Sequence, residues 1–311
     1  MKPVSVKTVH QGHHHFGWDN SLAPVLHVAP GDEVEFEVVD ASGGQLSEKS
    51  TAEDVRKLDF GRVNPVTGPV FVEGAEPGDT LVVDIVDLQG SGWGWSAIIP
   101  GFGLLAEDFR EPFLHISHYN ASYVEFTPEV RLPVRPFPGT IGVAPAEPGL
   151  HSVVPPREVG GNMDVRDLVR GSRLMLPVRV NGALFSVGDT HAAQGDGEVC
   201  GTAIESPMRV RLRFDLQKAT GQRRPRFIVN EPPTRHVDGK GYQVTAGIAP
   251  DLMTAARDAV REMIDLLGRE YRLEPALAYT LCSVAVDLRI SEVVDAPNWV
   301  VSAYLPRAIF V

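Results

Sequence analysis

The 311-residue chain has few cysteines and no long apolar run, and both absences exclude whole classes of protein. Its two cysteines, Cys200 and Cys282, are too few for the disulfide framework of a small secreted domain. No apolar stretch reaches the roughly 18 residues that a membrane-spanning helix needs. The first twenty residues are polar and rich in histidine, without the apolar core of a secretory signal. We therefore expect a cytoplasmic protein that does not interact with a membrane.

Positive charge is also scarce, because 29 lysines and arginines face 40 aspartates and glutamates, which gives a net charge of −11. A surface with this balance repels nucleic acid and anionic lipid, so we expect neither as a partner. The sequence also lacks a Gly-x-Ser-x-Gly nucleophile elbow, a phosphate-binding loop and a Cys-x-x-Cys pair. These absences argue against serine hydrolases of that type, nucleotide-binding proteins and thiolate zinc sites.

What the chain has in abundance is turns followed by strands. Pro30-Gly31-Asp32 and Pro77-Gly78-Asp79 each suit a type II turn, and each precedes a β-rich segment, at 33–40 and 80–87. In the first segment, apolar residues alternate with glutamates, which indicates a strand with one buried face. This repeat predicts a layered antiparallel β-structure.

Further strands are predicted in the middle of the chain. Prolines exclude helix from residues 131–160, where we expect a long connection with a strand at 140–143. The Asn181-Gly182 dipeptide between apolar runs 174–180 and 183–187 predicts a hairpin.

Helices are predicted only late in the chain. Apolar residues follow a helical stripe from 252 to 267, with Asp251 as the N-cap and Gly268 just past the end. Pro275 opens a second, shorter helix, and 284–294 is predicted as a strand. We expect a β-dominated α+β fold: a layered antiparallel β-sandwich or barrel-like core with a late helical element. We divide it into a β-rich domain, 1–150, and an α+β domain, 151–311, or regard it as one intertwined unit.

The densest polar segment, Gly188 to Glu205, is the strongest candidate for a functional site. It follows a predicted strand, so Asp189 and His191 are expected to project from a loop with a rigid base. A carboxylate and an imidazole in an Asp-x-His pair can bind one divalent cation. The alternative is a surface turn rich in aspartate and glycine.

Other polar groups could contribute to this site. Asp164 could add a ligand and Asn162 could bond a substrate carbonyl, although both also suit an ordinary Gly-Gly-Asn turn. His15 could contact metal or substrate, or lie on an exposed strand end. Cys200 is a candidate nucleophile beside a histidine, but its apolar neighbours favour a buried, inert thiol in a strand.

At these motifs the sequence resembles the acetamidase/formamidase family of amide hydrolases. The resembling segments are 63–70, 73–81, 141–145, 160–164, 188–205, 278–279 and 283–290. The resemblance implies a β-rich α+β fold, hydrolysis of a short amide such as formamide or acetamide to a carboxylate and ammonia, and a bound divalent metal, with zinc expected. It also admits hydrolysis of γ-lactams.

From the residues and this resemblance we assign roles. Asp189, His191 and Asp164 are expected to hold the metal, and Glu198 to be the general base. The residues expected to bind substrate or support these groups are Asn162, Gln194, Asp196 and His15. The alternative is a non-catalytic β-sandwich protein that binds a metal or small polar ligand there. We also expect a homo-oligomer, dimer or higher, because exposed sheet edges are often closed by self-association.

Overall fold

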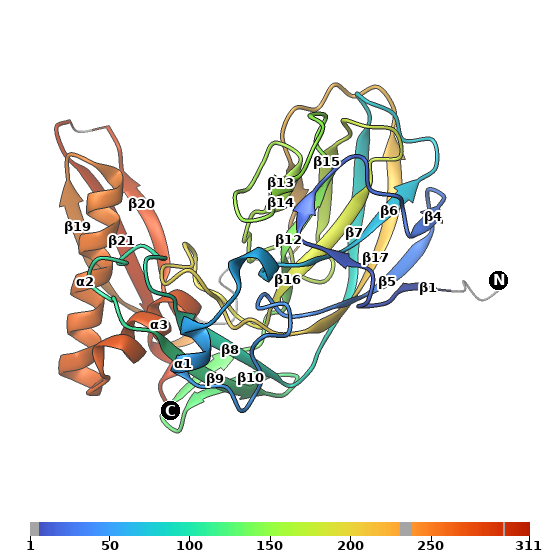
Figure 1. Cartoon of the computed structure of the whole chain (residues 1–311). Helices are drawn as coiled ribbons and strands as arrows, with labels where there is room; N and C mark the ends of the chain where they lie inside the picture. The colour runs from blue at the N-terminus through green and yellow to red at the C-terminus, as the bar shows by residue number, and fades with distance from the viewer. Residues whose placement is uncertain (1–5, 231–237, 295) are drawn as a thin grey trace.

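The computed structural model describes residues 6–230, 238–294 and 296–311, and its centre is a sandwich of two sheets (Figure 1). The first sheet has the strand order β1 (Lys7–Val9), β5 (Glu33–Val38), β17 (Met208–Gln217), β7 (Thr80–Gly90), β15 (Arg173–Pro177) and β18 (Arg226–Ile228). The second has the order β14 (Gly160–Asn162), β12 (Phe137–Val143), β16 (Phe185–His191), β6 (Val66–Val72) and β2 (His14–His15), with β4 (Leu26–Val28) beside β6.

Buried phenylalanines join the two sheets. Phe185 of β16 packs edge-on against Phe36 of β5 and Phe214 of β17, with ring centroids 5.8 and 5.0 Å apart. In β5 the predicted alternation is confirmed, since Phe36 and its neighbours two positions away are buried and the glutamates are not. Gly31 and Gly78 have φ of +96°, as type II turns require. The alternating pattern therefore determines which strand face enters the core.

A third sheet and helix α1 lie below the sandwich in Figure 1. The sheet contains β11 (Val130–Pro133), β10 (Tyr123–Thr127), β9 (Phe113–Tyr119) and β8 (Trp93–Ile98). Helix α1 (Ala52–Arg56) packs against β9 and is followed by the 3₁₀ turn η1 (Phe60–Arg62). A further short pair joins β3 (Gly17–Trp18) to β13 (His151–Ser152).

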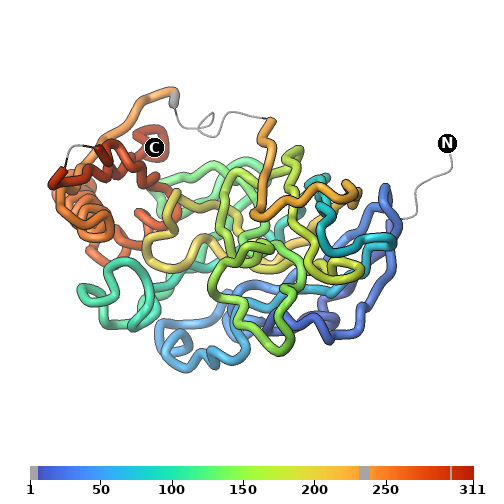
Figure 2. The backbone as a smooth tube through the Cα atoms, turned by 90° about the horizontal axis from the view of Figure 1, so that it is seen from above, coloured from blue at the N-terminus to red at the C-terminus, as the bar shows by residue number. Residues whose placement is uncertain are grey.

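The last part of the chain forms a unit at one end of the molecule (Figures 1 and 2). Its elements are η2 (Asp238–Lys240), β19 (Tyr242–Ala249), α2 (Leu252–Tyr271), α3 (Pro275–Ala285), β20 (Asp287–Glu292), β21 (Trp299–Pro306) and η3 (Arg307–Ile309). Strand β21 lies between β19 and β20, and α2 packs against this sheet. The Asp251 carboxylate caps α2 by accepting from Thr254 N at 2.8 Å, which confirms the predicted N-cap.

Three sequence expectations were wrong in detail. The two runs around Asn181-Gly182 do not form a hairpin, because β15 pairs with β7 in one sheet and β16 with β12 in the other. Gly182 N instead donates to Ala75 O, so the connection crosses between the layers. Helix α2 continues past Gly268 to Tyr271, and the strand predicted from residue 284 begins only at Asp287, after α3.

The fold class is confirmed: a β-dominated α+β structure with several antiparallel sheets and a late pair of helices. Strand β7 lies between β17 and β15, so residues before and after position 150 share one sheet. The division into two domains at that position stays a prediction. Among the described residues, no helix combines the length and apolarity needed to cross a membrane.

Candidate functional site

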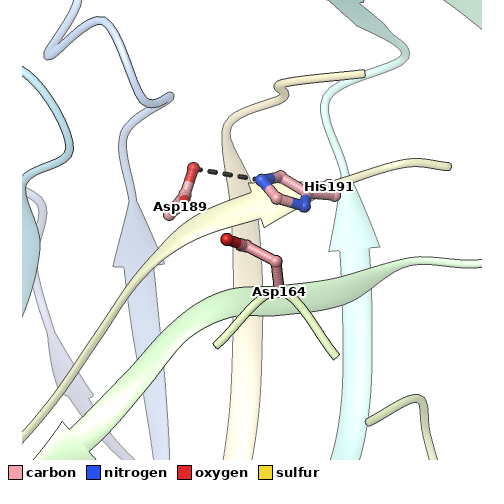
Figure 3. Close-up of side chains that lie close together, drawn as sticks. All are labelled: Asp164, Asp189 and His191. Carbon is pink, nitrogen blue, oxygen red and sulfur yellow. Dashed lines mark hydrogen bonds and ion pairs between the residues drawn. The ribbon is translucent and has the colours of Figure 1, made fainter. Parts of the chain in front are cut away.

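A buried polar cluster forms where β14, β12 and β16 lie side by side. Asp189 and His191 belong to β16 itself, not to the loop that the sequence suggested, because the strand continues through His191. Asp164 follows β14 by two residues, and Figure 3 shows the three side chains gathered in one place. A Cβ at Gly139 of β12 would lie 2.6 Å from both Asp164 Oδ1 and His191 Cε1. Glycine at this position therefore leaves the space that the cluster fills.

The backbone of the site is held in an uncommon conformation. Left-handed φ values occur at Asn64 (53°), Asp164 (49°), Asp189 (52°) and Glu198 (44°). Non-glycine residues seldom adopt this region, and each such residue costs free energy that the surrounding structure must offset. Such strain is concentrated at functional sites, where it aims side chains that regular structure would direct elsewhere.

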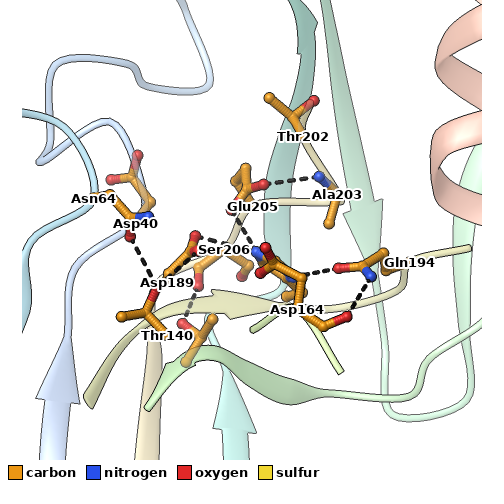
Figure 4. Close-up of polar contacts among 12 residues, drawn as sticks. Asp40, Asn64, Thr140, Asp164, Asp189, Gln194, Thr202, Ala203, Glu205 and Ser206 are labelled. Atoms are coloured by element: carbon orange, nitrogen blue, oxygen red, sulfur yellow. Dashed lines mark hydrogen bonds and ion pairs between the residues drawn. The ribbon is translucent and has the colours of Figure 1, made fainter. Parts of the chain in front are cut away.

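His191 is buried, and its two ring nitrogens have different partners. Nδ1 lies 2.9 Å from Gln194 Oε1, an acceptor, so Nδ1 carries the proton and donates it. Gln194 is held in turn, because its Nε2 donates to Asp164 O at 2.9 Å (Figure 4). The other nitrogen, Nε2, lies 3.1 Å from both Asp189 Oδ1 and Glu205 Oε2. A lone pair facing two carboxylate oxygens is stable only if a proton or a cation lies between them.

Two glutamates from the segment after β16 complete the cluster. Glu205 pairs with His191 through an isolated β-bridge, and its Oε1 accepts from Ala203 N at 2.8 Å. Glu205 Oε2 and Asp164 Oδ1 are both buried without a hydrogen-bond donor. Glu205 Oε2 does lie 3.1 Å from His191 Nε2, but this contact lacks hydrogen-bond geometry. Glu198 has a ligand atom within 4.8 Å of those of His191 and Glu205.

The three residues expected to bind metal are equally close to one another. Asp164, Asp189 and His191 also offer ligand atoms within 4.8 Å of one another. Tetrahedral zinc with bonds of about 2.0–2.2 Å places its ligand atoms about 3.4 Å apart. His191 Nε2 and its two carboxylate neighbours, at 3.1 Å, are close to that spacing. The donor set therefore fits one divalent cation at His191, with a choice of carboxylates.

Burial makes the negative charge of this cluster costly. Burial and the charge of Asp189 raise the pKa of Asp164 to about 7. Burial likewise raises the pKa of Glu205 to about 8, and burial together with Asp164 raises the pKa of Glu198 well above its usual value. Burial would also raise the pKa of Asp189, but the charge of His191 and the hydrogen bonds from His191, Glu205 and Thr140 together outweigh burial, and the pKa is lowered.

His191 responds in the opposite way. Burial alone would lower its pKa, but Glu205 and Asp189 raise the pKa well above the usual value. Within the described residues, the ion pairs of the four carboxylates involve His191 alone. Two buried acids, Asp189 and Glu205, two half-buried ones, Asp164 and Glu198, and one imidazole leave an excess of negative charge, which protons or a metal cation must neutralise.

The remaining predicted site residues fall in different places. Asn162 lies beside the cluster, where it accepts from Thr140 Oγ1 at 2.6 Å and from Asn64 Nδ2 at 3.0 Å. Asp196 is not among the clustered ligand groups, and its carboxylate pairs with Arg166 Nε at 3.2 Å. His15 is not brought to the cluster: it lies on β2, separated from β16 by β6, and its Nε2 is 2.9 Å from Ser186 Oγ.

The segment that carries Glu198 is held by the C-terminal unit. Gly195 N donates to Ser283 O at 2.8 Å, and Cys200 N donates to Ser283 Oγ at 3.1 Å. The Arg166 guanidinium binds both oxygens of Asp287, at the start of β20. The first two contacts join segment 283–290 to the 188–205 segment, as the bond from Gln194 Nε2 to Asp164 O joins segment 160–164 to it.

Cys200 lies in a turn of this segment, not in the strand that we expected. Its thiol is fully buried and contacts Ala97 O at 3.4 Å, and burial raises its pKa. A thiol with a raised pKa is a poor nucleophile at neutral pH, which disfavours a cysteine mechanism.

A cavity of about 180 Å³ opens onto the cluster. Its polar residues are Ser42, Asn64, Asn162, Asp189, Glu198, Thr202 and Glu205. Its apolar residues are Ala41, Leu58, Phe60, Val63, Trp95, Ile99, Phe102 and Val154. Sequence reasoning missed the partnership of Glu205 with His191 and also this apolar wall, since both depend on contacts between distant segments.

Comparison with known proteins gives consistent results over the whole chain. Residues 4–153 and 148–311 match the acetamidase/formamidase family. The formamidase of Methylophilus methylotrophus is 31% identical over 96% of this chain and 90% of its own, and the acetamidase of Mycolicibacterium smegmatis is 31% identical over 66% of each. Among solved structures, the gamma lactamase from Delftia acidovorans has a TM-score of 0.91 at 30% identity, covering 98% of this chain and 93% of its own. An acetamidase from Bacillus halodurans has a TM-score of 0.69 at 31% identity, covering 96% of each chain.

Proposed function

The chain belongs to the acetamidase/formamidase family of amide hydrolases, and we propose that it hydrolyses a short aliphatic amide to a carboxylate and ammonia with the help of a bound divalent metal. One observation carries this proposal: His191 Nε2 faces oxygens of Asp189 and Glu205 at 3.1 Å, and both of these buried carboxylates line the cavity. That geometry provides both a cation site and a place for a small substrate beside it.

The residues that would hold the metal are His191, Asp189 and Asp164, with Glu205 as an additional candidate. Zinc is our first choice, because imidazole and carboxylate donors suit it. When bound, the metal polarises the amide carbonyl and lowers the pKa of water towards neutrality.

Glu198 is the proposed general base. Burial and the charge of Asp164 raise its pKa well above the usual value, and a bound cation would lower the pKa again to a range in which the carboxylate accepts a proton and can return it. Glu198 takes the proton that water loses as its oxygen adds to the carbonyl carbon. It then delivers that proton to the nitrogen as the C–N bond breaks and ammonia leaves. Asn162, on the cavity wall, is placed to orient the amide.

The test is an amide panel with protein whose metal content has been measured. Formamide, acetamide and propionamide are followed by ammonia release, and γ-butyrolactam by the appearance of 4-aminobutyrate. Chelation should remove about one or two ions per chain together with activity, and His191→Ala should lower both occupancy and rate. Full turnover by metal-free protein would contradict the mechanism, whereas retained metal with no turnover of any substrate would favour a binding protein.

A γ-lactam is the second candidate substrate. The fold is more similar to that of the Delftia gamma lactamase, with a TM-score of 0.91, than to that of the Bacillus acetamidase, with a TM-score of 0.69. The sequence identities to the two are nearly equal, so this difference in fold similarity supports a γ-lactam. Faster turnover of γ-butyrolactam than of the linear amides would favour it.

We also keep a cytoplasmic homo-oligomer as a proposal. Self-association is supported by one face of the sheet that contains β19, the face turned away from α2, where Val244 and Ile248 are exposed. Apolar side chains gathered on one sheet face suit an interface. Sedimentation velocity at several protein concentrations tests it, and a monomer throughout would contradict it.

A further inference from the structure

The proposed hydrolysis involves polar residues of the cavity and gives its apolar side no role. Three of its side chains remain substantially exposed: Phe60 by 58%, Phe102 by 43% and Val154 by 40%. They come from η1, from the segment after β8 and from the proline-rich connection, so three distant parts of the chain meet at one opening. Large apolar side chains that stay in water around a pocket often mark the place where a ligand covers them.

This apolar wall is held in place by the surrounding structure. Asp59 caps the turn that carries Phe60 by accepting from Gly61 N at 2.9 Å, and Asp59 N in turn donates to Gln45 Oε1 at 2.9 Å. Deeper in the cavity, Trp95 is fixed by a hydrogen bond from its Nε1 to Asp40 Oδ1 at 2.9 Å. The wall is therefore largely preformed, as binding pockets usually are.

The apolar wall is also joined to the residues proposed for chemistry. A Cβ at Gly201 would lie 2.5 Å from the Phe102 ring, so this ring lies directly on the glycine. Gly201 N donates to Glu198 O at 2.8 Å, which links the ring to the turn that carries the proposed base. An apolar group held against Phe102 is thus one turn away from Glu198.

The volume of the cavity sets the size of that group. An apolar protein cavity of about 150 Å³ accommodates a molecule the size of benzene, and this cavity is about 180 Å³. Formamide and acetamide are far smaller and would leave most of the apolar wall in contact with water. From the wall and the volume together, we infer that the preferred substrates are amides with an apolar acyl chain of about four or five carbons. This inference rests on the proposed amide hydrolysis. The carboxamide would lie beside the carboxylates that line the cavity, and the acyl chain against Phe60, Phe102 and Val154.

The first experiment measures kcat/KM for acetamide, propionamide, butyramide and pentanamide with the metal-loaded protein. Carbonyl reactivity changes little along this series, so differences report the contact of each added methylene with the protein. We expect kcat/KM to rise about fourfold per methylene as far as butyramide or pentanamide. A fall from acetamide onward, with acetamide still hydrolysed, overturns the inference and leaves the proposed function intact. No turnover of any amide overturns both.

Two variants change the wall in opposite directions. Phe60→Ala removes apolar surface from an exposed turn and should lower the ratio of kcat/KM for pentanamide to that for acetamide about tenfold. Val154→Phe fills the cavity and should move the best substrate towards acetamide. Phe227→Ala is the matched control, because Phe227 is 44% exposed on β18, outside the cavity, and its loss should leave the ratio unchanged. Unchanged ratios in both wall variants would overturn the inference.

Discussion

Replacing Gln194 with leucine tests whether this side chain sets the orientation of His191. Leucine has a similar size but can neither accept from His191 Nδ1 nor donate to Asp164 O, so both of these groups lose their partner. Leaving a buried polar group unpaired costs about 1–3 kcal/mol, so the two losses together should lower the free energy of unfolding by about 2–6 kcal/mol. With Nδ1 no longer restrained, metal affinity should fall about 10–100-fold, as for other groups that support a ligand histidine.

Two further variants separate these effects. Gln194→Glu keeps an acceptor for Nδ1 but loses the donor to Asp164 O, so it should retain more metal affinity than Gln194→Leu. Gln222→Leu is the control, because Gln222 Nε2 also makes two hydrogen bonds, to Met175 O and Arg224 O at 2.8 and 2.9 Å, but lies far from the cluster in the fold. It should alter stability modestly and metal affinity not at all.

Urea unfolding measures the stability of each variant, and titration against a competing chelator measures metal affinity. If Gln194→Leu binds metal as tightly as the unaltered protein, Gln194 does not orient His191. The reasoning about the protonated nitrogen would then be wrong.

Three other predictions concern the cluster and the ion pair that supports it. Glu198→Gln should keep metal occupancy but lower kcat by roughly 10²–10⁴, measured by ammonia release, whereas an emptied site would make Glu198 a ligand. In metal-free protein, Asp164 and Glu205, with pKa values of about 7 and 8, hold protons that the unfolded chain releases above about pH 4–5. The folded state then binds more protons, so the melting temperature should fall as pH rises from about 5 to 8, and a rise would contradict this sign. Asp287→Asn leaves Arg166 buried without its bidentate partner and should cost about 3 kcal/mol in urea unfolding, an estimate that a change under 1 kcal/mol would refute.

Much of the architecture could be predicted from the sequence, because local patterns determine it. Alternating apolar residues determine which face of β5 is buried, and the glycines of the two Pro-Gly-Asp turns supply the positive φ that those turns need. The helical stripe and Asp251 determine α2 and its start, and Pro275 determines the start of α3. Periodicity and capping act over a few residues, so a sequence window contains all the information they need.

The composition of the site could also be predicted, although the roles of its residues stay predictions. Asp189, His191 and Gln194 are close in sequence, and the fold brings Asp164, which belongs to a separate motif, next to them. His15 illustrates the limit of this approach, because its position in a histidine-rich segment says nothing about which strand lies between it and β16.

Only the tertiary structure decided which groups meet across long distances in the chain. Three such features depend on how the layers pack. They are the assignment of β15 and β16 to different sheets, the contact of Glu205 with His191 and the space above Gly139. The cavity joins Phe60, Phe102 and Val154, which no local pattern relates. Periodicity and turn chemistry determine elements one at a time, whereas a pocket and its electrostatics arise from burial among segments that the sequence keeps apart.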